Sequence, residues 1–105
     1  MPKFVLAYHG KPDINSNEEG VAHMAAWRAW SAGLGDAIVD PGMPVGPSKT
    51  ITANGVVDGG GSNPLSGITI IQADTMEEAI VMAKDCPHVS GDGTIEIAEA
   101  MDMEM

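Results

Sequence analysis

The chain has 105 residues, a formal net charge of −10 and a single cysteine. This length predicts one domain, residues 1–105. Fifteen acidic residues against five basic ones repel phosphate backbones and anionic lipid surfaces, so we expect neither nucleic acid nor a membrane as partner. One cysteine excludes an internal disulfide and is typical of a reducing compartment. The sequence carries no signal peptide pattern or spanning apolar run, and we expect a cytoplasmic protein.

The first predicted elements are a strand and a long helix. Residues 3–8 alternate between two faces, which is typical of a β-strand. Ser16 and Glu19 stand three residues apart as in a capping box, so we expect a helix to begin at about residue 17. Glycines at 33 and 35 are typical of a helix end and place the last helical residue at about 34.

Short strands and turns are predicted in the middle of the chain. Residues 37–39 form a short strand candidate, and the prolines and glycines of residues 41–47 predict a long turn-rich connection after it. Residues 49–53 are β-branched and alternating, and residues 56–57 return along them. The Asn54-Gly55 pair between these segments is the strongest hairpin signal in the chain.

The last third of the chain predicts a strand, a helix and a final strand. A glycine-rich stretch over residues 58–67 runs straight into residues 67–73, the clearest strand of the sequence. Residues 74–75 offer two candidate N-caps for a second helix, which Pro87 ends. Residues 94–98 alternate and predict the last strand.

This element order predicts an α+β domain. An antiparallel βαββαβ sheet of about four strands, with both helices on one face, is the ferredoxin-like solution. The other face then has no helix to cover it, although Ile68, Ile70 and Ile71 make the strand apolar on both sides. A second copy of the same sheet is the simplest cover, so we expect a homodimer.

The candidate catalytic residues centre on His23. At about 100° per residue, His23, Trp27 and Trp30 lie on one narrow arc of the predicted helix. We expect an aromatic-walled cavity in which the tryptophans hold a substrate and His23 acts as a general acid or base. A core histidine bound to a backbone carbonyl is the alternative. Asp36 and Asp40, at the two ends of the predicted strand, are candidate carboxylate partners of His23, with a turn role as the alternative for both.

Three further residues are expected to contact a ligand near the glycine-rich stretch. Asp58 and Ser66 flank the glycines and can hydrogen-bond a ligand, and His9 is expected at the same end of the sheet. A mobile lid or a tight bulge is the alternative for Gly59–Gly61. His88 is expected in an exposed turn. The histidines lack metal-ligand spacing and no cofactor motif appears, so we expect neither a metal nor a cofactor.

As a set, four segments resemble the YCII-related (DGPF-type) domain family over nearly the whole chain. The segments are Met1–Tyr8, Asp36–Gly42, Asp58–Gly61 with Ser66-Gly67, and Glu77–Ala79 with Cys86-Pro87. The family's signature lacks its proline and phenylalanine here. The resemblance implies a ferredoxin-like fold that dimerises into an α/β barrel. It also implies that His23 carries the family's helix histidine and that Asp40 or Asp36 carries its aspartate.

Two function classes fit these residues. The first is a protein that binds a small organic molecule in a cavity between the sheet and the first helix. The second is a cofactor-free His/Asp acid–base enzyme of the lyase, isomerase or dehalogenase-like kind, in which His23 moves a proton. A structural interaction module, whose tryptophans pack solidly against the sheet, is a third alternative. The sequence leaves open whether the protein is an enzyme.

Overall fold

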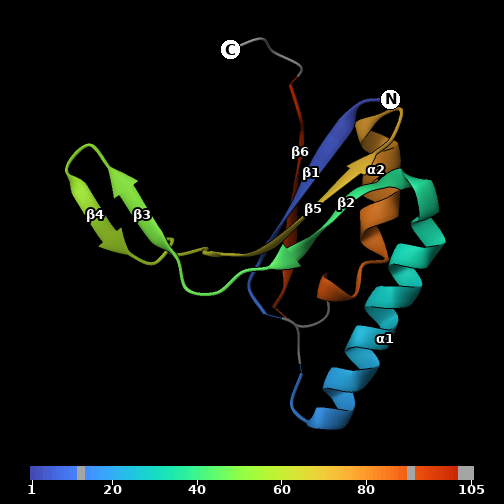
Figure 1. Cartoon of the computed structure of the whole chain (residues 1–105), viewed down its shortest axis with the longest axis horizontal. Helices are drawn as coiled ribbons and strands as arrows, with labels where there is room; N and C mark the ends of the chain where they lie inside the picture. Colours follow the sequence, from blue (N-terminus) through green and yellow to red (C-terminus); the bar gives the residue numbers. More distant parts are fainter. Residues whose placement is uncertain (12–13, 90–91, 102–105) are drawn as a thin grey trace.

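The chain folds into an α+β structure built on one four-stranded antiparallel sheet, as the sequence predicts (Figure 1). The computed structural model describes residues 1–11, 14–89 and 92–101. The sheet order is β2-β5-β1-β6, which is compatible with a ferredoxin-like arrangement. The sheet strands and helices are β1 (Lys3–His9), α1 (Asn17–Leu34), β2 (Ile38–Pro44), β5 (Leu65–Gln72), α2 (Met76–Lys84) and β6 (Thr94–Glu99).

The two helices begin where their capping residues predict. Ser16 is the N-cap of α1, and its hydroxyl oxygen accepts a hydrogen bond from the backbone N–H of Glu19 at 3.1 Å. Thr75 caps α2 in the same way through the N–H of Glu78. Each cap satisfies a backbone donor that the first helical turn leaves unpaired. Among the described residues, neither helix is long and apolar enough to cross a membrane.

The hydrophobic core lies between one face of the sheet and the two helices. Phe4, Leu6 and Ile71 are fully buried there. Trp30 from α1 and Ala79 from α2 belong to the same buried cluster, so both helices cover the same face. The small alanine side chain lets α2 approach the sheet closely, and the larger strand residues fill the space between the layers.

The opposite side of the sheet, here called the open face, bears a second apolar set. Val5, Ala7, Ile68 and Ile70 alternate with the core residues along the two central strands and are only half-buried. Val5 pairs with Ile70, and Ala7 pairs with Ile68, so these side chains form one contiguous patch. No described element covers this patch, because both helices pack on the other face.

Strand β2 is longer than the sequence predicts. A strand over residues 37–39 and a turn-rich connection over residues 41–47 were expected, but β2 continues through Pro41 and Gly42 to Pro44. Two irregularities interrupt its pairing with β5. Because β2 is an edge strand with bulges, it tolerates a proline that lacks an N–H. Gly42 has a φ of 69°, and a Cβ there would lie 1.8 Å from the carbonyl oxygen of Ile68. A side chain is therefore excluded at this position.

Between β2 and β5 the chain forms a hairpin that leaves the main sheet, as Figure 1 shows. It consists of β3 (Lys49–Thr52) and β4 (Gly55–Asp58), joined at the predicted Asn54-Gly55 turn. We call residues 49–58 the arm. The Nζ of Lys49 contacts a carboxylate oxygen of Asp58 at 2.5 Å across the base of the arm.

The molecule exposes more surface than a compact chain of its mass. Its accessible surface is 7299 Å², whereas a folded monomer of 10.9 kDa exposes about 5,600 Å². Its radius of gyration is 15.1 Å, against about 13 Å for a compact domain of this length. A two-stranded arm outside the main sheet adds surface without adding a core.

Candidate functional site

The most distinctive polar contact of α1 joins two predicted site residues. The indole N–H of Trp27 donates a hydrogen bond to Nε2 of His23 at 2.7 Å. The two residues are one helical turn apart, which is the spacing at which side chains of a helix meet. Both are half-buried, and their ring planes are nearly perpendicular with centroids 6.2 Å apart. The sequence therefore placed these two side chains on one face correctly.

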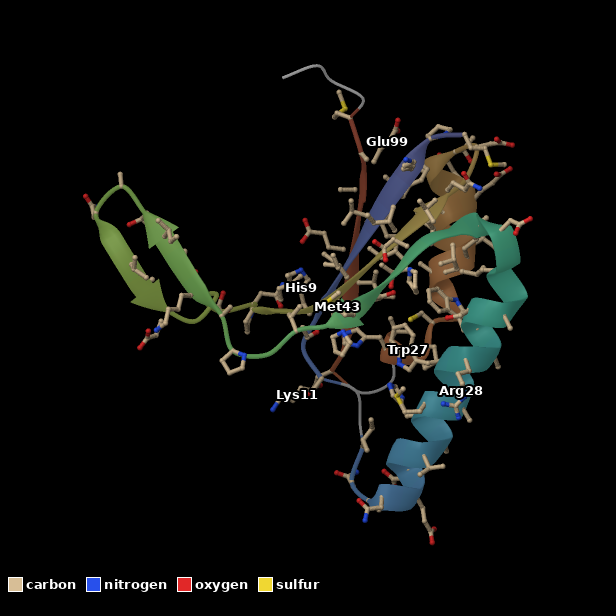
Figure 2. The ribbon with its side chains drawn as sticks, in the orientation of Figure 1. His9, Lys11, Trp27, Arg28, Met43 and Glu99 are labelled. Atoms are coloured by element: carbon tan, nitrogen blue, oxygen red, sulfur yellow. The ribbon has the colours of Figure 1, made fainter. Side chains whose placement is uncertain are left out.

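An aromatic row extends from His23 into the core. The ring of Trp27 contacts Tyr8 of β1 edge-on at 5.3 Å and Trp30 at 5.5 Å. Trp27 lies between α1 and the sheet, whereas the next residue, Arg28, is exposed (Figure 2). The rings of Tyr8 and Trp27 thus occupy the space between helix and sheet at this level. The free edge of the row is the His23 end.

Trp30 belongs to the inner end of the row. It is only 8% exposed, and its indole N–H donates to the backbone carbonyl of Met82 in α2 at 2.8 Å. A buried indole needs such an acceptor, and here the acceptor also ties α1 to α2. Trp30 is therefore built into the core, and Trp27 is the tryptophan that stands nearer the surface.

The hydrogen bond from Trp27 determines the tautomer of neutral His23. Because Nε2 accepts a hydrogen bond from the indole N–H, the proton of the neutral ring resides on Nδ1. Partial burial lowers the pKa of His23, and the nearby His88 lowers this pKa further. No described residue accepts a hydrogen bond from Nδ1. The arrangement leaves a neutral imidazole with one free donor at the edge of an aromatic wall.

Neither candidate aspartate contacts His23 in the described part of the chain. A carboxylate oxygen of Asp40 accepts a hydrogen bond from the backbone N–H of Gly42 at 2.8 Å, a turn contact two residues away. Asp36 lies exposed in η1 (Gly35–Ala37), the short 3-10 turn between α1 and β2. Its backbone carbonyl accepts from the side-chain amide of Gln72. A His–Asp dyad stays a prediction, and Asp40 would have to leave the N–H of Gly42 to form it.

His88 is not in an exposed turn, contrary to the sequence-based expectation. It is 5% exposed and lies in η2 (Pro87–Val89), a 3-10 turn that follows α2. Its Nε2–H donates to the backbone carbonyl of His9 at 2.8 Å, and its ring packs 5.1 Å from Tyr8. The 3-10 turn brings the residue beneath the end of β1. These partners are 79 and 80 residues away in the chain, so no local sequence pattern predicts the burial of His88.

His9 and Ser66 lie together, but on the other side of the sheet from His23. Nε2 of His9 is 3.2 Å from a carboxylate oxygen of Glu96, and Nδ1 faces the backbone carbonyl of Asn63 at 3.0 Å. The pairing of β1 with β5 skips Ser66, whose hydroxyl is buried without a hydrogen-bond partner among the described groups. Glu96 was not among the predicted site residues, although its alternation with Ile95 and Ile97 in β6 is the signal that places it on the open face.

The remaining predicted contact residue, Asp58, is separate from both groups. It ends β4, its side chain is 90% exposed, and its contact is the ion pair with Lys49. Two of the three glycines that follow it adopt positive φ angles, 82° at Gly59 and 81° at Gly61. These values fit the turn role that dense glycine predicts. The predicted site residues therefore divide into a His23 group, a His9 group and an isolated Asp58.

An open apolar groove lies at a third position, away from all predicted site residues. It has a volume of about 380 Å³ and runs between α2 and β6. Its lining consists of Met76, Ile80, Ala83, Lys84, Val89, Ile95 and Ile97. Within the described residues, no three acidic, histidine or cysteine side chains gather as a metal site would need.

Neither a protein-family model nor a curated protein matches this chain.

Proposed function

We propose that this protein binds a small organic molecule at the His23 edge of the aromatic row, where α1 meets the sheet, and acts as a homodimer. The single observation that carries the binding function is the hydrogen bond from Trp27 to Nε2 of His23. It fixes a half-buried, neutral donor, Nδ1–H, next to an aromatic edge. A few oriented polar groups beside an apolar wall are the usual elements of a small-molecule site.

The chemistry of the ligand follows from these groups. An aromatic or otherwise flat apolar part packs on the edge of Trp27, and a hydrogen-bond acceptor meets Nδ1–H of His23. The acceptor is neutral, such as a carbonyl oxygen, because the formal net charge of −10 disfavours anionic ligands. The lowered pKa of His23 agrees with a ring that donates without carrying a charge.

Binding is favoured over acid–base catalysis by the state of the ring. A general base needs a free lone pair, and the Nε2 lone pair of His23 already accepts from Trp27. The carboxylate that would orient the ring is engaged elsewhere, because Asp40 accepts from Gly42. The resemblance to the YCII-related family fits either function, since it implies a helix histidine in both.

A cofactor-free acid–base enzyme is the second candidate, and one observation favours it. The lowered pKa keeps His23 neutral at physiological pH, which is the protonation state of a base. Catalysis then requires Trp27 to release Nε2 when substrate binds. The substrate would be a carbonyl compound that loses a proton next to the carbonyl group.

The homodimer is supported by the open face. Its apolar side chains form one contiguous patch, unlike the singly scattered apolar residues of an ordinary surface. They are Val5, Ala7, Ile68 and Ile70. The accessible surface exceeds that of a compact monomer by about 1,700 Å², which is more than the roughly 800 Å² that each partner buries in a standard interface. Two copies that share their open faces would remove the apolar patch of each.

The binding function is tested with a matched pair of probes, acetophenone and ethylbenzene. They share the ring and the two-carbon side chain, and only acetophenone has a carbonyl oxygen. Titrations followed by amide and imidazole NMR resonances should show tighter binding of acetophenone, with shifts at His23 and Trp27. His23→Phe should abolish this preference, and the control His9→Gln should keep it. Equal binding of both probes, or shifts confined to the open face, would contradict the proposal.

The same samples separate binding from catalysis. In deuterated water, a base that removes a methyl proton of acetophenone leads to deuterium at that carbon, because the solvent returns a deuteron. Exchange that the protein accelerates and that His23→Phe abolishes would favour the enzyme. Binding without accelerated exchange favours the binding protein.

A further inference from the structure

The arm exposes apolar side chains on both of its faces. Ile51 is 81% exposed, Val56 60% and Val57 56%. Ile51 pairs with Val56 on one face of the hairpin, and Val57 pairs with Thr50 on the other. No described residue outside the arm covers these three side chains. Exposed β-branched residues on an unpaired hairpin are costly, because such strands invite association with another chain.

The arm is tied to the rest of the chain by hydrogen bonds at its base. The backbone N–H of Gly59 donates to the carbonyl of Ser48 at 2.8 Å, and the hydroxyl of Thr50 donates to the carbonyl of Gly59 at 2.6 Å. Beyond the base, the two strands of four residues pair with each other and belong to no other sheet of the described chain. A two-stranded hairpin alone is marginally stable in water. We therefore expect packing against another surface to stabilise the arm.

The position of the arm indicates where that partner sits. Figure 1 shows the arm on the side of the sheet away from α1 and α2. This is the side of the open face, since both helices cover the core face. His9 and Met43 stand near the point where the chain leaves the sheet toward the arm (Figure 2). Met43 pairs with Ile68 and is 66% exposed, so the apolar patch of the open face continues toward the arm.

We infer that the arm packs against a second copy of this chain, so that each subunit of the homodimer contacts the arm of the other. This inference rests on the proposed dimer and adds a surface to it. One molecule seated on the open face lies within reach of the arm, and a two-fold axis makes the contact reciprocal. The arm suits an acidic chain as partner, because Lys49 and Asp58 are its charged residues and neutralise each other.

The surface area agrees with a dimer that uses both regions. The excess is about 1,700 Å² per chain, whereas a standard interface buries about 800 Å² per partner. The excess is therefore large enough to accommodate an interface of the obligate-dimer class, in which each partner buries more than about 1,000 Å². Contact through the open face together with two arms is consistent with this size.

The first test compares two matched charge insertions by sedimentation velocity over a dilution series. Ile51→Lys places a charge on the arm, and Val81→Lys places one on α2, at a valine that is 65% exposed and outside both surfaces. Ile51→Lys should weaken dimerisation at least about 10-fold, as loss of an interface anchor does. Val81→Lys should leave it unchanged. Circular dichroism of both variants should match the original chain.

The second test locates the arm directly. A photo-crosslinking benzoylphenylalanine replaces Val57, and equal amounts of ¹⁴N- and ¹⁵N-labelled chains are mixed before irradiation. Mass spectrometry should find crosslinked peptides of mixed label, joining the arm to the open face of the other chain. Crosslinks that carry one label throughout would show that the arm packs on its own subunit, and the inference would be wrong.

A further variant distinguishes the contact of the arm from the homodimer itself. A third variant, Ala98→Lys, lies on the open face, where Ala98 pairs with Val5. If Ala98→Lys dissociates the dimer and Ile51→Lys does not, the proposed dimer is kept and the contact of the arm with the second subunit is rejected. If the original chain stays monomeric at every concentration, both are rejected. None of these changes touches His23, so ligand binding is judged independently.

Discussion

The core and the arm use the same kinds of residue in opposite environments. Ile71 in β5 and Ile51 in β3 both sit in alternating, β-branched strands, yet Ile71 is fully buried and Ile51 is 81% exposed. The difference lies in what stands opposite each side chain. Ile71 meets two helices across a packed layer, and Ile51 meets only its neighbour Val56 across the hairpin.

This contrast teaches that local strand-forming character and burial have different origins. The hairpin forms because its turn residues and β-branched pairs favour it. Burial requires a second layer, and the chain supplies one layer of helices for one face of one sheet. The open face and the arm are the two surfaces left over, which is why we assign both to a partner subunit.

The largest expected effect comes from truncating the same residue in both regions. Ile71→Ala should lower the free energy of unfolding by about 3 kcal/mol, because it leaves a cavity in a closed core. Ile51→Ala should change it by less than about 0.5 kcal/mol when the chain is monomeric. Urea titrations of dilute protein measure both values. A large effect of Ile51→Ala under monomeric conditions would mean that the arm packs on its own subunit.

A glycine pair tests the edge of the sheet where it leads into the arm. Gly42→Ala should cost about 2–3 kcal/mol, since its Cβ would overlap the carbonyl oxygen of Ile68 and its φ is positive. The matched change Gly46→Ala meets no heavy atom within 4 Å and should be nearly neutral. Thermal and urea unfolding compare the two. Equal stability of the variants would show that β2 is free to move away from β5.

A hydroxyl deletion in each region compares their polar contacts. The hydroxyl of Tyr8 donates to the hydroxyl of Thr69 at 2.8 Å in a buried site, and burial raises the pKa of Tyr8. Tyr8→Phe should lose about 1 kcal/mol, because the Thr69 oxygen loses its donor where water does not replace it. Thr50→Val removes the half-buried bond to Gly59 and should cost less than about 0.5 kcal/mol. The reverse order would mean that the base of the arm is the more rigid region.

Local signals predicted most of the framework. The first helix spans Asn17–Leu34, as expected, because a capping box and a glycine stop are both local in sequence. The continuation of β2 through Pro41 and Gly42 was missed. Proline and glycine argue against a strand, and only the presence of β5 alongside makes a bulged edge strand favourable there.

The candidate site was predictable only where it lies within one helix. The contact of His23 with Trp27 follows from a four-residue spacing. The burial of His88 depends on η2 packing beneath β1, and the pair of His9 with Glu96 depends on the register of two strands far apart in the chain. Such contacts are set by tertiary structure, which a single sequence does not display as a pattern.

The smallest expected effect concerns pH and the half-buried ring of His23. Its pKa in the folded protein lies below the ordinary value of 6.5, which we take for the unfolded chain. Above 6.5 both states are neutral at this residue, and its contribution to stability is complete. As the pH falls through 6.5, the unfolded chain gains a proton that the folded ring resists, so stability declines until the folded pKa is passed.

The measurement is the difference between two stability profiles, because other histidines and the carboxylates also titrate with pH. Urea unfolding of the original chain and of His23→Gln, taken from neutral to mildly acidic pH, should show a shallower loss of stability in the variant. The control Met24→Gln, at an exposed position next to His23 on α1, should keep the profile of the original chain, because it removes no titratable group. Parallel profiles for His23→Gln and the original chain would mean that the ring is as free to take up a proton in the folded state as in the unfolded one. The neutral donor beside Trp27 would then be lost as the basis of ligand binding, while the contrast between core and arm would stand.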